Sequence, residues 1–242
     1  MLGHSINIGT YAKIPIKIHW SFFLVLIYIA WISHSEGLDL NLTLSLAVHV
    51  FLLFLCVVFH EYGHAIAARK YGIKTRDIIL SPIGGLARLE SIPDKPMAQF
   101  VIAFAGPLVN LVIFLTAGIV YLIFNSFIFR PQSIVDLDYF KHPSSLLFPI
   151  LIINAVLFLF NLIPAYPMDG GRILKSLLCL KFDKYKATII AANIGRVFAI
   201  AFLALGAYQK YFALLFIGLF IYVTATKEHH FAKMRRKHSL EK

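Results

Sequence analysis

The stretch FHEYGHAIAARK, from Phe59 to Lys70, places two histidines and a glutamate inside an otherwise apolar segment. The nine residues before it, VFLLFLCVV at 50–58, carry no charge, and the first Lys or Arg after His60 is Arg69. At ~1.5 Å per helical residue, His60 lies ~13 Å along the helix from Arg69. Ionisable side chains at such depth in a membrane are unfavourable and usually mark function. The stretch therefore predicts a functional site within a membrane-spanning helix.

The composition of the 242-residue chain also indicates a membrane protein. Hydrophobic residues make up 59%, charged residues only 14%, and the mean hydropathy is +0.77. Soluble domains carry charge on about a quarter of their residues. Because each span takes about 20 residues, the spans would use most of the chain. We expect one transmembrane domain over 1–226 and a basic cytosolic tail over 227–242.

Six apolar segments predict an all-α polytopic membrane protein with about six transmembrane helices. These segments are 18–33, 42–68, 97–129, 146–163, 187–208 and 212–226. An even number puts both termini on one side. Most of the 23 Lys and Arg residues fall in loops on the side of the tail, so the positive-inside rule predicts that both termini are cytosolic, most simply at the cell membrane. The basic surplus then marks cytosolic loops, and we expect a lipid bilayer rather than nucleic acid as a partner.

Two segments lack the continuous apolar pattern of a transmembrane helix. Residues 73–90 alternate short apolar runs around Pro82, Gly84 and Gly85, which predicts a small membrane-associated β-hairpin on the cytosolic side. The run PAYPMDGG at 164–171 must break the fourth helix. Backbone freed in this way is tolerated at membrane depth where it is buried in protein or lines a water-filled cavity.

His60, Glu61 and His64 spell HExxH, the spacing of a zinc site on a helix. Both imidazoles project from one face and can bind one zinc ion per chain, with Glu61 beside it as general base. A different interpretation makes the histidines hydrogen-bonded core residues and pairs Glu61 with Arg69. The position of the motif inside an apolar span favours the metal site.

A catalytic zinc site usually has three protein ligands and one open position. Cys56 and His49 lie too far along the helix axis from the histidine pair. Asp169 follows the break after the fourth span and lies in the same cytosolic half as His60. Spacing alone makes Asp169 a candidate third ligand without deciding the matter.

Several motifs occur together in a fixed order along the chain. They are IPIKIHWSF at 14–22, HEYGH at 60–64, SPIGGLARLE at 81–90, AGPLVN at 105–110 and NLIPAYPMDGG at 161–171. In this combination the sequence resembles the site-2 protease family of intramembrane zinc metalloproteases. The resemblance covers most of the chain. The PDZ or paired nucleotide-sensing domains that members often carry have no counterpart within residues 1–242, so ATP sensing is not inferred from them.

The resemblance implies a role for each site residue. His60, His64 and Asp169 are expected to be zinc ligands and Glu61 the catalytic base, with Asn161 as a donor to the oxyanion. The implied activity is hydrolysis of peptide bonds in or near transmembrane segments of membrane-protein substrates, as in regulated intramembrane proteolysis.

The predicted hairpin raises a question about substrate binding. Gly84 and Gly85 could expose a strand edge to which an unwound substrate segment adds, and a lid or structural turn is an equally supported interpretation. We expect a transmembrane protein substrate, while a regulatory membrane partner and the oligomeric state stay open.

Other functions compete with proteolysis. One alternative is another kind of membrane zinc hydrolase, acting on lipids or prenylated termini, but it fits the helix-break and AGPLVN motifs less well. A zinc transporter or a non-catalytic membrane adaptor is the alternative from a different class, but transport needs polar residues along a full path, and here they cluster in one half of the bilayer. For Asn110 the sequence favours a packing role. For Asn154, hydrogen bonding between helices is at least as well supported as a donor role like that of Asn161.

Overall fold

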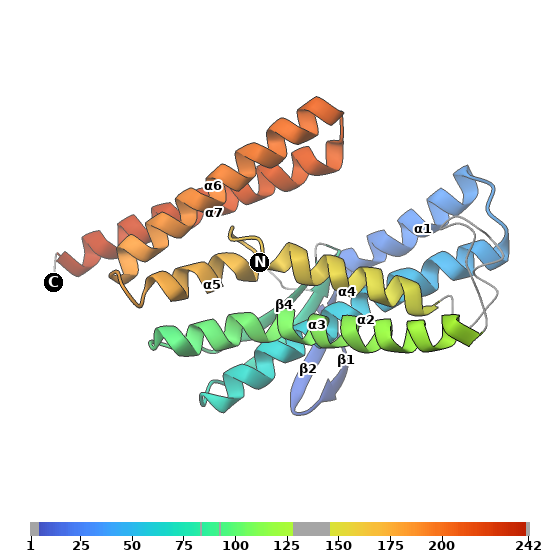
Figure 1. The fold of residues 1–242 in the computed structure, drawn as a ribbon, viewed down its shortest axis with the longest axis horizontal. Coiled ribbons are helices and arrows are strands. Elements are labelled where there is room, and N and C mark those ends of the chain that lie inside the picture. The colour runs from blue at the N-terminus through green and yellow to red at the C-terminus, as the bar shows by residue number, and fades with distance from the viewer. Residues whose placement is uncertain (1–4, 83, 92, 128–145, 241–242) are drawn as a thin grey trace. The chain divides into compact units, whose positions relative to one another are not determined.

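The computed structural model describes residues 5–82, 84–91, 93–127 and 146–240. The chain forms two compact units, Met1–Ser91 with Leu108–Phe158 and Ile92–Pro107 with Leu159–Lys242. The strands are β1 (Ser5–Tyr11), β2 (Ile14–His19), β3 (Thr75–Ser81) and β4 (Gly84–Leu89). The helices are the 3-10 turn η1 (Trp20–Phe22), α1 (Phe23–Ser35), α2 (Leu40–Lys70), α3 (Pro96–Phe127), α4 (Leu147–Asn161), α5 (Asp169–Leu178), α6 (Lys184–Gln209) and α7 (Phe212–Leu240) (Figure 1).

Among the described residues, four helices are long and apolar enough to cross a membrane. Their spanning segments are Leu40–Lys70, Pro96–Ile123, Lys184–Gln209 and Phe212–Lys237. Two further predicted spans correspond to shorter apolar helices, Trp20–Ser35 and Leu147–Asn161. The protein is therefore mostly helical with four candidate spans, and the six-span topology stays a prediction. The predicted end of the third span, at 129, lies outside the described residues.

The start of the first predicted span is wrong. Ile18 and His19 belong to β2, and α1 begins only at Phe23. Ile18 pairs with Leu80 of β3 in a parallel ladder, so strand pairing overrides the apolar run that suggested a helix.

The sheet is larger than the single predicted hairpin. Its strand order is β1-β2-β3-β4, with β3 and β4 forming the expected antiparallel pair and β2 running parallel to β3. β1 and β2 were not predicted. Their tight turn places Ala12 and Lys13 at φ of 50° and 64°, and it lacks the Asn-Gly or Asp-Gly pair that usually signals such turns.

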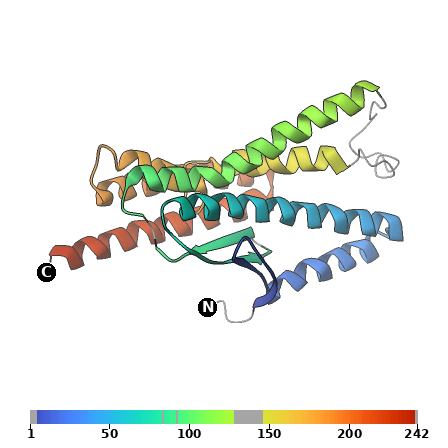
Figure 2. The same ribbon diagram turned by 90° about the horizontal axis from the view of Figure 1, so that it is seen from below.

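One face of the sheet packs against α2, as Figure 2 shows. The buried residues at this contact are Ile14, Ile16, Val57, Val58, Ala65, Ile78 and Leu80. Full burial of one such side chain stabilises a fold by about 1.5–3 kcal/mol. This packing holds β4 beside the helix that carries HExxH.

A charged cluster joins three strands of the sheet. Asp77 is fully buried, and its carboxylate accepts hydrogen bonds from Lys17 Nζ at 2.8 Å and from the Arg88 guanidinium. The Arg88 hydrogen bond first, and Lys17 after it, lower the pKa of Asp77 to about 2 against the opposing effect of burial. The cluster therefore ties β2, β3 and β4 together.

In the second unit, α6 and α7 run side by side as an antiparallel pair (Figure 1). Small residues allow this close approach: a Cβ at Gly206 would lie 2.9 Å from Leu215 N, and one at Gly218 would lie 3.0 Å from Ala199 O. Lys210, in the left-handed conformation, ends α6. Helix α7 continues to Leu240, so the described part of the predicted tail is helical.

Candidate metal centre and active site

The two motif histidines lie buried on α2, His60 with 5% and His64 with 6% of its surface exposed. Their Nε2 atoms are 3.1 Å apart. Two imidazole lone pairs cannot face each other at this distance unless a proton or a cation lies between them. Ligand nitrogens at about 2.0–2.1 Å from a tetrahedral zinc ion are roughly 3.3 Å apart, so the pair fits a zinc site.

Asp169 is the first residue of α5, and its side chain is also buried. The glycines after it permit a close backbone approach within the second unit. A Cβ at Gly170 would overlap the carbonyl oxygens of Leu162 and Ile163, and one at Gly171 would lie 2.8 Å from the carbonyl carbon of Ala165. The PMDGG sequence therefore starts α5 at Asp169 and packs it tightly against the segment that follows α4.

His60 and His64 of the first unit and Asp169 of the second are all buried side chains of types that bind metal ions. Two imidazoles and one carboxylate are a donor set that zinc uses in catalytic sites with an open fourth position. The residues present thus fit zinc chemically, while their individual roles as ligands stay predictions.

Glu61 contacts the edge of the sheet. Its Oε2 accepts a hydrogen bond from the Ala87 backbone N–H at 2.8 Å. A Cβ at Gly85 would lie 2.7 Å from Glu61 Cγ and 2.9 Å from Val57 Cγ1. Glycine at position 85 therefore lets β4 approach the glutamate of the HExxH motif.

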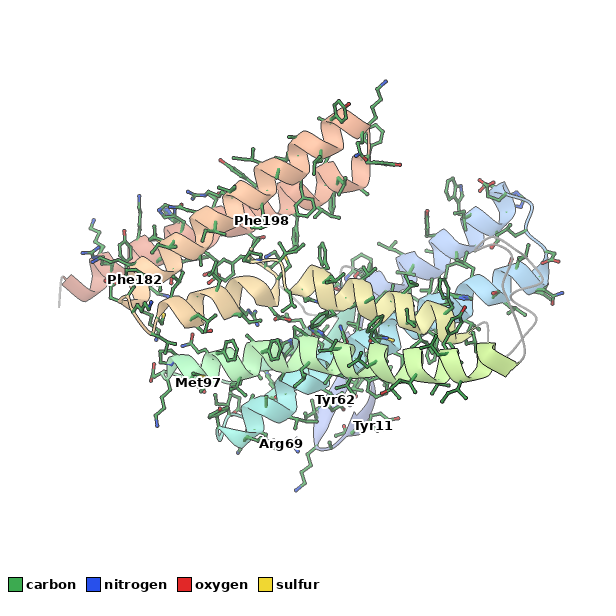
Figure 3. The ribbon with its side chains drawn as sticks, in the orientation of Figure 1. Tyr11, Tyr62, Arg69, Met97, Phe182 and Phe198 are labelled. Carbon is green, nitrogen blue, oxygen red and sulfur yellow. The ribbon has the colours of Figure 1, made fainter. Side chains whose placement is uncertain are left out.

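Arg69, near the C-terminal end of α2, binds the β1–β2 turn rather than Glu61. The Arg69 guanidinium donates to the carbonyl of Ala12 in the β1–β2 turn at 2.5 Å, and the Tyr62 hydroxyl donates to the carbonyl of Tyr11 at 3.0 Å. Figure 3 shows Tyr11, Tyr62 and Arg69 at this end of the helix. These contacts weigh against an ion pair between Arg69 and Glu61.

The remaining predicted site residues occupy element ends. Asn161 is the last residue of α4 and is partly buried. Gly84 begins β4 with φ of 131°, a backbone conformation that favours glycine. The roles of Asn161, Gly84 and Gly85 stay predictions.

The structure also brings Asn110 into this region, where the sequence favoured packing. Asn110 is fully buried on α3, and its side-chain amide lies 3.1 Å from His60 Nδ1. An amide in an apolar helix signals that a polar partner exists. The sequence could not identify the partner because the contact depends on how α3 packs against α2.

A polytopic helical protein with a zinc-type HExxH helix against a small sheet belongs to the class of membrane metalloproteases. The model of peptidase family M50 matches residues 48–148 and 131–202. The chain therefore belongs to peptidase family M50, the site-2 protease family, as its motifs predicted.

Individual relatives agree with this assignment. A zinc metalloprotease of Methanocaldococcus jannaschii is 39% identical over 227 residues, 94% of this chain and 61% of the relative. Stage IV sporulation protein FB of Bacillus subtilis is 25% identical over 187 residues, 77% of this chain and 58% of the relative. The solved site-2 protease from Methanocaldococcus jannaschii has a TM-score of 0.64 at 36% identity, covering 93% of this chain and 95% of that one.

The chain thus spans about 60% of the length of these two curated relatives, 61% and 58% respectively. The printed name of the Methanocaldococcus jannaschii relative describes that protein as a zinc metalloprotease.

Proposed function

We propose that this chain is an intramembrane zinc endopeptidase that cleaves membrane proteins in or near their transmembrane segments. The observation that carries the proposal is the buried pair His60 and His64, whose Nε2 atoms lie 3.1 Å apart within a helix of membrane-spanning length. Membership of a family of peptidases supports the same reaction. The substrate class and the lipid bilayer are therefore the partners we propose.

His60, His64 and Asp169 would hold one zinc ion per chain. Their burial and their donor chemistry support this assignment. When bound, zinc supplies a Lewis acid that activates water and polarises a peptide carbonyl.

Glu61 is proposed as the general base. Its hydrogen bond from Ala87 N–H orients the carboxylate on the motif helix. A carboxylate held in this way can accept a proton from water and pass it to the leaving amide nitrogen. Asn161 is proposed to donate to the developing oxyanion, and removal of such a donor typically raises the barrier by about 2.7–4 kcal/mol.

Strand β4 is proposed to bind the substrate backbone. It is the last strand in the sheet order, and its Ala87 N–H already reaches the proposed base. A substrate segment that adds to this edge would replace the helical hydrogen bonds it loses on unwinding. Because Gly84 and Gly85 have no side chains, they would let the substrate segment approach Glu61.

The topology that suits this function has six spans with both termini in the cytosol, most simply at the cell membrane. The four long apolar helices and the shorter α1 and α4 supply the six segments. The distribution of basic residues supports the cytosolic orientation of the hairpin and of 227–242. The transmembrane domain would then cover 1–226.

A direct test compares purified wild type with Glu61→Gln in detergent. Both are assayed for zinc content and for cleavage of a panel of single-span proteins. Glu90→Gln is the matched control because Glu90 is exposed just after β4. We expect zinc in all three proteins and cleavage by wild type and Glu90→Gln alone.

Cleavage by Glu61→Gln at the wild-type rate would contradict the proposal. Zinc flux into liposomes that is the same for wild type and Glu61→Gln, without cleavage of any substrate, would instead identify a transporter.

A further inference from the structure

Asn110 has an unusual environment for a residue that merely packs between helices. Its side chain is fully buried, and its amide nitrogen Nδ2 lies 3.1 Å from His60 Nδ1. In this orientation its Oδ1 has no hydrogen-bond partner within the described part of the chain. A buried polar atom without a partner is unfavourable by about 1–3 kcal/mol. The orientation therefore leaves an acceptor unused beside a histidine ring.

The chemistry of His60 decides which way this amide must face. The Nε2 atom of His60 faces Nε2 of His64, so a metal ion shared by the pair binds His60 through Nε2. A neutral imidazole that binds a metal through Nε2 carries its proton on Nδ1, and that N–H is a donor. An amide nitrogen, which is also a donor, cannot accept it.

A half turn of the Asn110 amide removes this conflict. The turn exchanges Oδ1 and Nδ2, so that the carbonyl oxygen lies 3.1 Å from His60 Nδ1 and the nitrogen takes the position that the oxygen leaves. The two orientations have the same shape and differ only in hydrogen bonding. The oxygen then accepts from His60 Nδ1–H, and the nitrogen occupies the position in which the oxygen had no partner among the described residues.

We infer that Asn110 is a positioning residue for the metal centre: its Oδ1 accepts a hydrogen bond from His60 Nδ1–H and holds the ring with Nε2 available for zinc. This inference rests on the proposed function. Partners of this kind fix the tautomer and orientation of a ligand histidine, and their loss typically weakens metal binding by about 10–100-fold.

The chain offers a matched control in Asn154. It is equally buried, on α4, and its Oδ1 also has no partner among the described residues. Its amide nitrogen donates to the Ile150 carbonyl at 2.8 Å and to Cys56 Sγ at 3.2 Å rather than meeting a histidine of the motif. Substitution of Asn154 therefore reports what the loss of a buried amide does to the fold.

The experiment measures the zinc dissociation constant by competition with a chelator for wild type, Asn110→Asp, Asn110→Leu and Asn154→Leu. Thermal unfolding of each zinc-free protein is recorded beside it. Asp keeps an acceptor oxygen at position 110, whereas Leu keeps only similar volume. We expect Asn110→Leu to bind zinc about 10–100-fold more weakly than wild type, and Asn110→Asp and Asn154→Leu to bind within about threefold of wild type.

The inference is overturned if Asn110→Leu binds zinc as tightly as wild type, or if a folded Asn110→Asp loses as much affinity as Asn110→Leu. Nitrogen NMR of histidine-labelled, zinc-loaded wild type gives a readout that needs no variant. It should show the His60 proton on Nδ1, and a proton on Nε2 would exclude the role. Wild type that binds no zinc at all would instead refute the proposed function, so the two failures are distinguishable.

Discussion

Two buried polar clusters in the first unit differ in how their polar atoms are matched. Asp77 has no exposed surface, and two cations, Lys17 and Arg88, bind its carboxylate. His60 and His64 instead bring two ring nitrogens to 3.1 Å from each other. The first cluster pairs its buried anion with two cations of the protein and holds strands together. The second brings together two nitrogens that can bind a metal ion, as a metal site requires.

The contrast separates stability from catalysis in a measurable way. Changes in the Asp77 cluster should lower the free energy of unfolding and leave the chemistry of folded molecules intact. Changes around the HExxH motif should do the reverse. The following predictions test this division.

The largest expected effect is on catalysis. Glu61→Gln should lower kcat by about 10²–10⁴-fold, because the general base is lost while the shape of the side chain is kept. Its thermal stability should match wild type. Single-turnover cleavage measures the rate. A Glu61→Gln variant that is also strongly destabilised would show that Glu61 stabilises the fold, as the Asp77 cluster does.

Asp77→Asn should lower the free energy of unfolding by about 3 kcal/mol, because two cations lose their buried anion. Denaturation in detergent measures it. Asp94→Asn is the control: Asp94 is 99% exposed and 3.3 Å from Lys184, and such surface pairs contribute at most about 1 kcal/mol. Similar losses in the two variants would argue against a structural role for the Asp77 cluster.

Acid should act on the same cluster. The folded-state pKa of Asp77 is about 2, below its ordinary 3.8, so the carboxylate stabilises the fold fully above pH 3.8 and this stabilisation is lost as the pH falls towards 2. The shift corresponds to about 2 kcal/mol. Unfolding of wild type and Asp77→Asn as a function of pH should converge below this range, and a constant difference down to pH 2 would contradict the prediction.

The smallest expected effect is at Gly85. A Cβ there would meet Glu61 Cγ at 2.7 Å, so Gly85→Ala should displace the base and lower kcat about tenfold, which is about 1.4 kcal/mol in barrier. Zinc affinity should not change. In the matched variant Gly118→Ala, the added Cβ makes an ordinary 3.5 Å contact with Leu151 Cδ1. Equal kcat values for Gly85→Ala and Gly118→Ala would show that Gly85 has no role in the active site.

The sequence predicted the parts of this molecule that depend on local patterns. Hydropathy located the long helices, HExxH located the histidine pair, and the Gly84-Gly85 run located the β3–β4 hairpin. It missed the β1–β2 hairpin because Ala12 and Lys13 adopt positive φ without glycine or asparagine. The partner of Asn110 depends on packing between α2 and α3, which no local pattern encodes.

The most direct test of the central claim is the zinc content of wild type, Asp169→Ala and Asp183→Ala, each purified in detergent and shown to be folded. Asp183 is the control: it caps α6, where its carboxylate accepts from Lys186 N–H at 2.9 Å and lies 3.8 Å from Lys186 Nζ. We expect about one zinc ion per chain in wild type and Asp183→Ala and a strong loss in Asp169→Ala. Folded wild type without zinc, or Asp169→Ala with undiminished zinc affinity, would contradict it.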